Sequence, residues 1–453
     1  MRLFKRNAVM TTVHAVVAAL LATFCLQPGS AAADQCLNTR WTKALKMFAY
    51  PEDYTQYYVF NFYNTPDKQV MLKLTAQFPY ARYIGYTLYS IDNDDTEGNP
   101  IIYDATGAVQ HLSDVDIEAD DLNANPYLND VPRNVEDRNY TIYIVKEGSS
   151  RIHSNGDIEK NTLVIPDDVS KVSLFLRVYV PDDDSDNDFA QQGSVDLPII
   201  NAFEEIDETT QAQIQCPAEA QNSVGYFDIV DGTRVDRDSI LFYDPDRDKI
   251  ETFRAGDYGL FPNGDCPYLS TSLVHPIKNG DKIAVLRFKA PNFPNTRAGE
   301  EFSTDDEVRY WSVCMGNWKY TTTSGCIADQ DVNIDEDGFV NLVIGPDSLV
   351  AGDSRWNNLE WGTNMDPILI FRQITPSANF GYSFEVPDVA YDETTGTVFM
   401  NEMYKAAITI NPENTPEEEE AERRKVASYT ILEYAPVGKY CTINEFIQNR
   451  CGF

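Results

Sequence analysis

Four short segments in the first half of the chain are matched, in the same order, by four segments in the second half. The first set begins at Ala81, Leu112, Tyr140 and Leu174, and its counterparts begin at Val308, Ile327, Phe339 and Leu369. Any one match would be weak, but four in sequence indicate an internal duplication. The repeated elements include an Arg-Tyr pair, an Asp-x-Asp pair and an Arg inside an apolar run. We therefore expect two related folding units.

Runs of alternating, β-branched and aromatic residues recur throughout the chain, bounded by Asp, Asn, Gly and Pro, which is typical of strands and turns. The predicted strands are 71–76, 83–91, 140–145, 172–180, 282–289, 339–344 and 368–374. The pattern predicts a mainly β fold of two divergent antiparallel β-sandwich or jelly-roll-like units packed together. A long interval between Asp116 and Tyr140 indicates an insertion in the first copy, and inserted loops are where function often varies.

Only two segments look helical. One is 34–46. The other begins at Thr415-Pro416, where Thr can cap a helix and Pro suits its first position. We therefore expect few short helices.

The first 33 residues resemble a secretory signal peptide. Basic residues precede an apolar stretch, 16–26, which is too short to span a bilayer, and small residues precede the expected cleavage after Ala33. No later segment approaches the roughly 20 apolar residues of a membrane helix. We predict an exported protein, periplasmic or extracellular, without an integral membrane segment after cleavage. Its predicted parts are the signal peptide 1–33, a first unit 34–215 and a second unit 216–453.

The chain is strongly acidic, with a formal net charge of −35. Phosphate backbones would be repelled, which argues against nucleic-acid binding. Solubility, or life in a salty medium, is favoured as the reason for the charge over a surface that collects cations.

Cysteines in an exported protein are expected to form disulfides. Short loops favour the pairs Cys314–Cys326 and Cys441–Cys451, and Cys216–Cys266 is the preferred third pair, although spacing does not settle the connectivity. The absence of CxxC spacing disfavours zinc.

The repeated charged residues form a candidate site for an anionic ligand. Arginine can hold a carboxylate or phosphate with two parallel hydrogen bonds. The alternative, which we favour, is that each Arg pairs with an Asp of its own unit and fixes the strand order. The candidate residues are Arg82, Asp114, Asp116 and Arg177 in the first unit and Arg309, Asp329, Asp331 and Arg372 in the second.

Aromatic residues concentrate in the second unit, and Trp356 and Trp361 lie in a polar, turn-like stretch. Their rings could stack on a glycan, so they are the candidates for exposed binding residues. Packing in the core is the favoured alternative because Trp is mostly buried.

Clusters of acidic residues raise the question of calcium, which takes many oxygen ligands. Asp244, Asp246 and Asp248 stand at alternate positions and are the candidate ligands. Because Asp-rich turns also arise without a metal in so acidic a chain, no cofactor is firmly predicted.

The chain resembles a family of uncharacterised exported bacterial proteins. The segments that carry the resemblance are 78–83, 125–127, 176–181, 193–198, 309–314, 325–329 and 440–441. No activity is established for that family, so the resemblance implies no catalytic residue.

Enzyme signatures are nearly absent, since the chain has four histidines and no HExxH, GxSxG or phosphate-binding loop. We therefore favour a non-catalytic exported binding or structural module whose ligand is a glycan or a small anion bound between the units. The alternative is a secreted hydrolase that uses two carboxylates on a glycan or other polymer, with Asp114 and Asp116 or Asp329 and Asp331 as the first pairs to consider. A third possibility is a surface protein that assembles through strand edges.

Overall fold

The structure is a computed structural model of the whole chain. It describes residues 41–44, 49–64, 68–91, 110–206, 210–219, 249–254, 261–278, 280–317, 320–362, 365, 367–388 and 415–453. The predicted signal peptide lies outside these residues.

The first half of the chain forms two sheets of five strands. The first inner sheet has the order β1-β2-β8-β4-β5, and the first outer sheet has the order β10-β9-β3-β6-β7. The strands are β1 (Thr42–Lys43), β2 (Thr55–Tyr63), β3 (Val70–Gln77), β4 (Ala81–Ser90), β5 (His111–Ser113), β6 (Asn139–Lys146), β7 (Thr162–Ile165), β8 (Lys171–Pro181), β9 (Ile199–Glu205) and β10 (Gln211–Ile214).

The second half forms two more sheets of five strands. The second inner sheet has the order β12-β13-β19-β15-β16, and the second outer sheet has the order β11-β20-β14-β17-β18. The strands are β11 (Lys249–Ile250), β12 (Phe253–Arg254), β13 (Tyr268–Ser272), β14 (Ile283–Lys289), β15 (Tyr310–Asn317), β16 (Thr323–Ala328), β17 (Phe339–Ile344), β18 (Asn357–Leu359), β19 (Pro367–Ile374) and β20 (Val437–Cys441).

The two halves share one strand order. Each inner strand of the first half has a counterpart at the same place in the second, for example β4 with β15 and β8 with β19. Pairing is antiparallel except at two equivalent places, where β6 pairs with β7 and β17 with β18 in parallel. One difference is that β10 follows β9 in the chain, whereas its counterpart β11 opens the second half.

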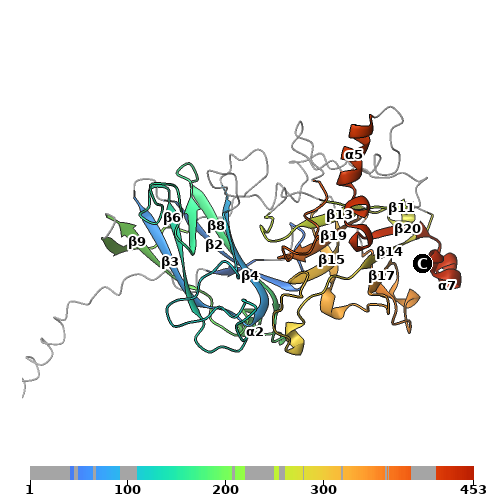
Figure 1. The fold of residues 1–453 in the computed structure, drawn as a ribbon, viewed down its shortest axis with the longest axis horizontal. Coiled ribbons are helices and arrows are strands. Elements are labelled where there is room, and N and C mark those ends of the chain that lie inside the picture. Colours follow the sequence, from blue (N-terminus) through green and yellow to red (C-terminus); the bar gives the residue numbers. More distant parts are fainter. Residues whose placement is uncertain are drawn as a thin grey trace, which may run out of the picture.

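Each pair of sheets encloses its own apolar core. In the first half, Phe60, Leu72 and Leu174 come from three strands of the two sheets and meet in one cluster. In the second half, Leu286, Leu342 and Phe371 do the same. Figure 1 shows the two halves side by side, with β4 and β15 close to the boundary between them. The mainly β, sandwich-like fold predicted from the sequence is confirmed.

The helices are few and short. They are α2 (Asp188–Gln191), α5 (Pro416–Lys425), α6 (Ala427–Thr430) and α7 (Ile443–Asn449). The 3-10 turns are 276–278, 296–298, 329–331, 347–349, 432–434 and 450–452. In the described part of the chain, no helix is long and apolar enough to cross a membrane.

The two helix predictions have different outcomes. Thr415 caps α5 and forms a capping box with Glu418, which confirms the second predicted helix. The first prediction, 34–46, is wrong in its described part, because Thr42 and Lys43 form β1 and pair with β2. Helix α7 was not predicted, although Thr442 and Glu445 form a second capping box that the sequence displays.

The predicted boundary between 215 and 216 remains a prediction. Cys216 packs against the first core. Ala218 accepts a hydrogen bond from the backbone of Tyr63, and Glu219 forms a bridge with Phe62. Residues 216–219 thus contact the first half.

Two leucines provide a test of the core. Leu174 is fully buried, whereas Leu122 is 98% exposed. We expect Leu174→Ala to lower the free energy of unfolding by about 2–5 kcal/mol, because it removes buried methyl groups and leaves a cavity. Leu122→Ala should change it by less than about 0.5 kcal/mol. Denaturant titration measures both values, and equal effects of the two substitutions would contradict the described core.

Candidate functional site

The inner sheets of the two halves face each other, and side-chain alternation decides what lies between them. In β4, Ile84, Tyr86 and Leu88 point into the first core. The side chain of Tyr83, from the opposite face of β4, joins a separate cluster with Tyr310 of β15. Strand β4 is buried along almost its whole length because both of its faces are covered. The face between the inner sheets carries buried polar and charged side chains as well.

One buried ion pair crosses from the first half to the second. Arg82 Nη1 lies 2.5 Å from Asp329 Oδ1, and both side chains are fully buried. Arg82 Nη2 also donates to Gln330 Oε1 at 2.8 Å. Asp329 accepts a further hydrogen bond from the backbone N–H of Trp311 at 3.0 Å. Burial raises the pKa of Asp329, and Arg82 acts in the opposite direction.

The counterpart pair crosses in the reverse direction and is looser. Arg309 Nη1 lies 3.7 Å from Asp114 Oδ1, and neither atom has a hydrogen-bond partner among the described residues. Asp114 accepts a hydrogen bond from the backbone of Ile84 at 3.1 Å, as Asp329 does from Trp311. Burial raises the pKa of Asp114 to about 7, against the lowering effect of Arg309.

The inserted segments of the two halves explain why the second pair is loose. Arg309 donates instead to the backbone oxygen of Tyr127 at 3.2 Å, and its guanidinium lies 3.8 Å from the ring centroid of Phe302. The rings of Tyr127 and Phe302 stack at 5.6 Å. Tyr127 belongs to the insertion between β5 and β6, and Phe302 to a long segment between β14 and β15. These two segments, each longer than its counterpart in the other half, therefore pack on each other.

The favoured expectation that each Arg pairs with an Asp of its own unit is wrong for Arg82 and Arg309. Both pairs cross the interface, because the start of each inner strand lies against the other half. The second acid of each motif is outside the interface core. Asp116 is exposed and accepts from Ser113 Oγ at 2.9 Å. Asp331 is also exposed, and its hydrogen bond with Tyr54 helps to raise the pKa of that tyrosine, although burial is the larger cause.

The remaining two predicted arginines hold connecting segments of the opposite half. Arg177 Nη2 donates to the backbone oxygen of Phe261 at 2.8 Å. Arg372 Nη2 donates to the backbone oxygen of Tyr50 at 2.5 Å. Both acceptor residues have left-handed backbone conformations and are followed by Pro. An aromatic residue followed by Pro, as in Tyr50-Pro51 and Phe261-Pro262, is a sequence signal that could have indicated these two equivalent contacts.

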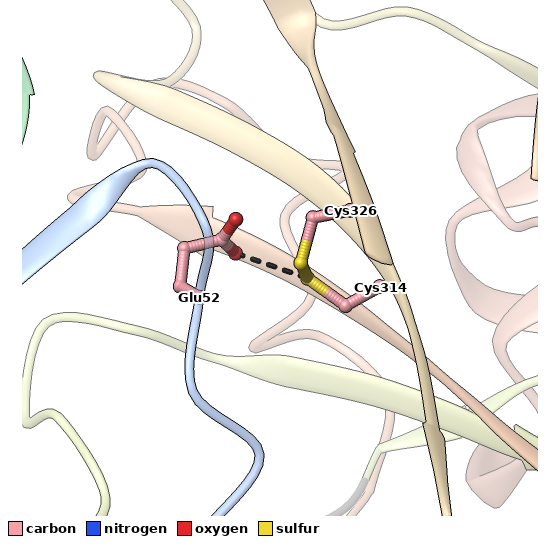
Figure 2. Close-up of side chains that lie close together, drawn as sticks. All are labelled: Glu52, Cys314 and Cys326. Carbon is pink, nitrogen blue, oxygen red and sulfur yellow. Dashed lines mark hydrogen bonds between the residues drawn. A yellow bond between two sulfur atoms is a disulfide. The ribbon is translucent and has the colours of Figure 1, made fainter. Parts of the chain in front are cut away.

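Glu52, also absent from the sequence predictions, lies at the centre of a buried cluster. Its Oε2 accepts from Ser312 Oγ at 2.6 Å and lies 3.2 Å from Arg372 Nη1. The same oxygen is 3.3 Å from Cys314 Sγ, which is bonded to Cys326 (Figure 2). Glu52 comes from the first half and the other residues from the second. The carboxylate thus joins the two halves as the Arg–Asp pairs do.

Glu52, Cys314 and Cys326 are also the one group of three potential metal ligands that converges among the described residues. Their ligand atoms lie within 4.8 Å of one another. Because the two sulfur atoms are bonded to each other, they do not serve as thiolate ligands in this state.

The equivalent place in the first half has no disulfide. Thr87 and His111 are paired across β4 and β5 as Cys314 and Cys326 are across β15 and β16. Thr87 Oγ1 lies 3.4 Å from His111 Nδ1, and His111 Nε2 lies 2.8 Å from Asp265 Oδ2 of the second half. The order Asp–His–Thr resembles a nucleophilic triad. However, Thr87 is fully buried and accepts a hydrogen bond from Arg177 at 3.0 Å, so it does not face a substrate.

Neutral phenols and one thiol fill the space between the arginines. Burial is the first cause of a raised pKa for Tyr83, Tyr179 and Tyr310. Burial also raises the pKa of Cys266 to about 12. These groups stay protonated at neutral pH, so the cationic arginines meet few formal charges beyond Glu52, Asp114 and Asp329.

Two of the three predicted disulfides are present. Cys314–Cys326 and Cys441–Cys451 are bonded. The predicted pair Cys216–Cys266 is wrong, because Cys266 is a free, buried thiol while Cys216 is disulfide-bonded. A short sequence separation predicted the two correct pairs. The remaining cysteines are far apart in sequence, so their separation did not indicate a partner.

Trp356 and Trp361 are buried, which agrees with the favoured alternative of core packing and not with their candidacy as exposed binding residues. Trp356 is 6% exposed and packs edge-on against Phe446 at 4.9 Å. Trp361 is 7% exposed and contacts the ring of His275 at 5.9 Å. Of their polar neighbours in sequence, Arg355 and Glu360 are exposed, whereas Asn357 is buried with the indole rings.

The candidate calcium ligands Asp244, Asp246 and Asp248 lie outside the described residues. Another acidic turn, 333–338, is described, and Asp335 there is occupied by protein donors. Its carboxylate accepts from the backbone of Phe339 at 2.8 Å and from Asn341 Nδ2 at 3.0 Å. It also pairs with Arg287 at 3.1 Å. This acid closes a turn between strands.

Comparisons with known proteins give only weak structural similarities. No family model and no curated protein matches the chain. An uncharacterised protein from Burkholderia cenocepacia is similar with a TM-score of 0.42 and 11% identity, over 82% of this chain and 88% of that one. A protein from Vibrio parahaemolyticus has a TM-score of 0.34 and 11% identity, over 75% and 88%. An anti-sigma factor domain-containing protein from Clostridium clariflavum has a TM-score of 0.17 and 8% identity, over 74% and 83%. These values carry no conclusion about activity, and the resemblance to a family of exported proteins stays a prediction.

The raised pKa of Asp114 predicts a pH dependence of stability. Its pKa is 3.8 when unperturbed and about 7 in the folded protein, so protonation favours the fold. This contribution is complete below about pH 4 and is lost as the pH rises through about 7. Between these values we expect the free energy of unfolding of the native chain to fall by about 4 kcal/mol more than that of Asp114→Asn.

Denaturant titrations between pH 4 and pH 8 measure this difference. Asp116→Asn is the matched control, because it changes the exposed acid of the same motif and should keep the pH dependence of the native chain. If Asp114→Asn showed that same pH dependence, the assignment to Asp114 would be wrong.

Proposed function

We propose that this protein is a non-catalytic, exported binding module in which two sandwich units form one rigid body. The observation that carries the proposal is that two arginines between the units form buried ion pairs with carboxylates of the opposite unit. Arg82, Asp329, Arg372 and Glu52 are buried and paired across the interface. A guanidinium that is already buried against a carboxylate of the other unit has its charge compensated and is closed off from solvent, so it is poorly placed to bind an anionic ligand. The residues of the candidate anion site therefore hold the two units together.

A surface feature of the second half supports binding of another class of ligand. Tyr382 is 41% exposed and stacks on Tyr434 at 5.2 Å with an interplanar angle of 14°. Phe380 packs edge-on against Tyr434 at 5.1 Å and fixes that ring from another side. An exposed ring held by two others provides a flat apolar platform at low entropic cost, since its rotamer is already restricted.

Polar groups surround this platform. Tyr434 donates to Glu307 Oε1 at 3.2 Å. Lys289 Nζ pairs with Glu433 at 2.5 Å and lies 5.6 Å from the centroid of the Tyr434 ring. Ligand sites commonly combine an apolar surface with a few fixed polar groups. A flat ring edged by carboxylates and one ammonium group suits the apolar face and hydroxyls of a neutral sugar, so we assign a glycan as the ligand class.

Export belongs to the same proposal. The signal-like segment 1–33 lies outside the described residues, and two disulfides are of the kind that form and persist in oxidising compartments. An exposed aromatic platform on a secreted, acidic scaffold is compatible with contact to extracellular glycans.

One observation favours the hydrolase alternative. Asp114 has a pKa of about 7, a value that suits a general acid. Its side chain is nevertheless fully buried and faces Arg309. Release of reducing ends from a glycan by the native chain, lost in Asp114→Asn, would support the hydrolase and contradict the binding module.

We expect soluble neutral oligosaccharides, tested as a panel of chito-, cello- and xylo-oligosaccharides, to raise the stability of the native chain. At a ligand concentration one hundred times the Kd, the increase is about 2.7 kcal/mol. Tyr382→Ala should abolish it because the exposed stacking surface is lost. Thermal unfolding and isothermal titration calorimetry measure both effects.

Tyr429→Ala is the matched control. Tyr429 is 44% exposed and packs beside Arg423, and no other aromatic ring of the described residues stacks on it. It should retain the ligand-induced stabilisation. No stabilisation by any of the oligosaccharides, or an equal loss in both variants, would contradict the assigned platform.

A further inference from the structure

The disulfide between Cys314 and Cys326 joins residues that are directly opposite each other on β15 and β16. In the first half, the equivalent positions are held by the non-covalent contact of Thr87 with His111. The same strand pairing thus forms without a covalent link in one half. The strands of the second half are also held by their ladder and by pairing of β15 with β19. A disulfide at this place is therefore not needed to bring the strands together.

The two sulfur atoms have different surroundings. Cys314 is fully buried, and its Sγ lies 2.9 Å from Arg372 Nη1. Cys326 is partly exposed, and its backbone N–H donates to Asp53 Oδ2 at 2.9 Å. Figure 2 shows the bond between the two sulfurs, with Glu52 approaching Cys314. Cys326 is thus the cysteine of the pair on the solvent side, while a guanidinium faces Cys314.

We propose that Cys314–Cys326 is a thiol–disulfide exchange site for a dithiol reductant. One thiolate of the dithiol attacks Cys326 Sγ, the bond between the two cysteine sulfurs breaks, and Cys314 leaves as a thiolate. The second thiol of the reductant, as a thiolate, then attacks its own sulfur in the mixed disulfide and releases Cys326 as a thiolate. The dithiol is oxidised by two electrons to its cyclic disulfide, the pair is reduced by two electrons, and its two protons pass to the cysteine thiolates through water.

The positions of Arg372 and Glu52 favour Cys314 as the sulfur that leaves and Cys326 as the sulfur that is attacked. A cation beside the departing sulfur stabilises the thiolate, and a better leaving thiolate departs faster. After the exchange, the protonated Cys314 thiol is placed to donate to Glu52 Oε2, 3.3 Å away. The backbone pairing of β15 with β16 keeps the two thiols opposite each other, so oxidation can re-form the bond.

The other described disulfide provides an internal reference. Cys441 and Cys451 are both buried in an apolar cluster with Phe446 and Trp356. Neither sulfur combines exposure with a facing guanidinium among the described contacts. Exchange at this pair would require the incoming thiolate to enter an apolar environment, which raises its barrier.

Limited reduction with dithiothreitol under native conditions, followed by alkylation and mass mapping, tests the proposal. We expect Cys314 and Cys326 to be labelled first, with Cys441–Cys451 intact. Cys266 should remain unlabelled, because its thiol is buried and its pKa is about 12. Reduction of Cys441–Cys451 before or together with Cys314–Cys326 would overturn the proposal.

Two substitutions with opposite expected effects separate sulfur chemistry from simple loosening of the interface. Arg372→Gln should slow the reduction of Cys314–Cys326 by about tenfold, because the leaving thiolate loses its cation. Glu52→Gln should accelerate it, because a repelling negative charge is removed while the side chain can still accept from Ser312. If both variants were reduced faster than the native chain, local opening would explain the exchange and the proposal would fail.

Arg177→Gln is the matched control. Arg177 is the counterpart of Arg372 and holds a connecting segment in the same way, but it faces Thr87 where Arg372 faces Cys314. In Arg177→Gln, Cys314–Cys326 should be reduced at the same rate as in the native chain. A slowing as large as that in Arg372→Gln would overturn the proposal. Arg372→Lys keeps the positive charge, so Cys314–Cys326 should be reduced in this variant at nearly the native rate. This variant provides the test if Arg372→Gln does not fold.

Discussion

A buried arginine–carboxylate pair that crosses between the inner sheets, Arg82 with Asp329, determines how the halves of this protein sit together. A buried charge that loses its partner is strongly destabilising, so Arg82 and Asp329 are each stable in the interior only when the other half is in place. Arg372 and Glu52 repeat the arrangement at the end of a connecting segment. The interface therefore specifies one orientation of the halves, whereas apolar contacts alone would tolerate several.

The places where the halves differ are grouped around this interface and on the second half. The insertion carrying Tyr127 and the segment carrying Phe302 stack on each other and draw Arg309 away from Asp114. At another equivalent place, Thr87 and His111 stand where the second half has a disulfide. The two halves thus share one scaffold. The positions at which they differ include Asp114 with its raised pKa, the candidate exchange site Cys314–Cys326 and the exposed ring of Tyr382.

The strands and the two short-loop disulfides could be predicted from the sequence because alternation and loop length are local properties. The partners of Arg82 and Arg309 could not. A repeat shows which residues are equivalent, but pairing within a unit and pairing between units leave the same sequence pattern. Core packing was favoured for Trp356, but the sequence could not identify its cover, the ring of Phe446, which is far away in sequence. Glu52 could not be predicted because its partners, Ser312 and Arg372, are 260 and 320 positions away in sequence.

A double-mutant cycle on Arg82 and Asp329 tests the interface most directly. We predict that Arg82→Met and Asp329→Asn each lower the free energy of unfolding by about 3–5 kcal/mol, and that the double variant loses at least about 1 kcal/mol less than the sum. The same cycle on Arg82 and Asp114, which belong to one half, should be additive within about 0.5 kcal/mol. If the free-energy changes were additive for Arg82 with Asp329 but coupled for Arg82 with Asp114, Arg82 would pair within its own half. That result would contradict an ion pair between the two halves.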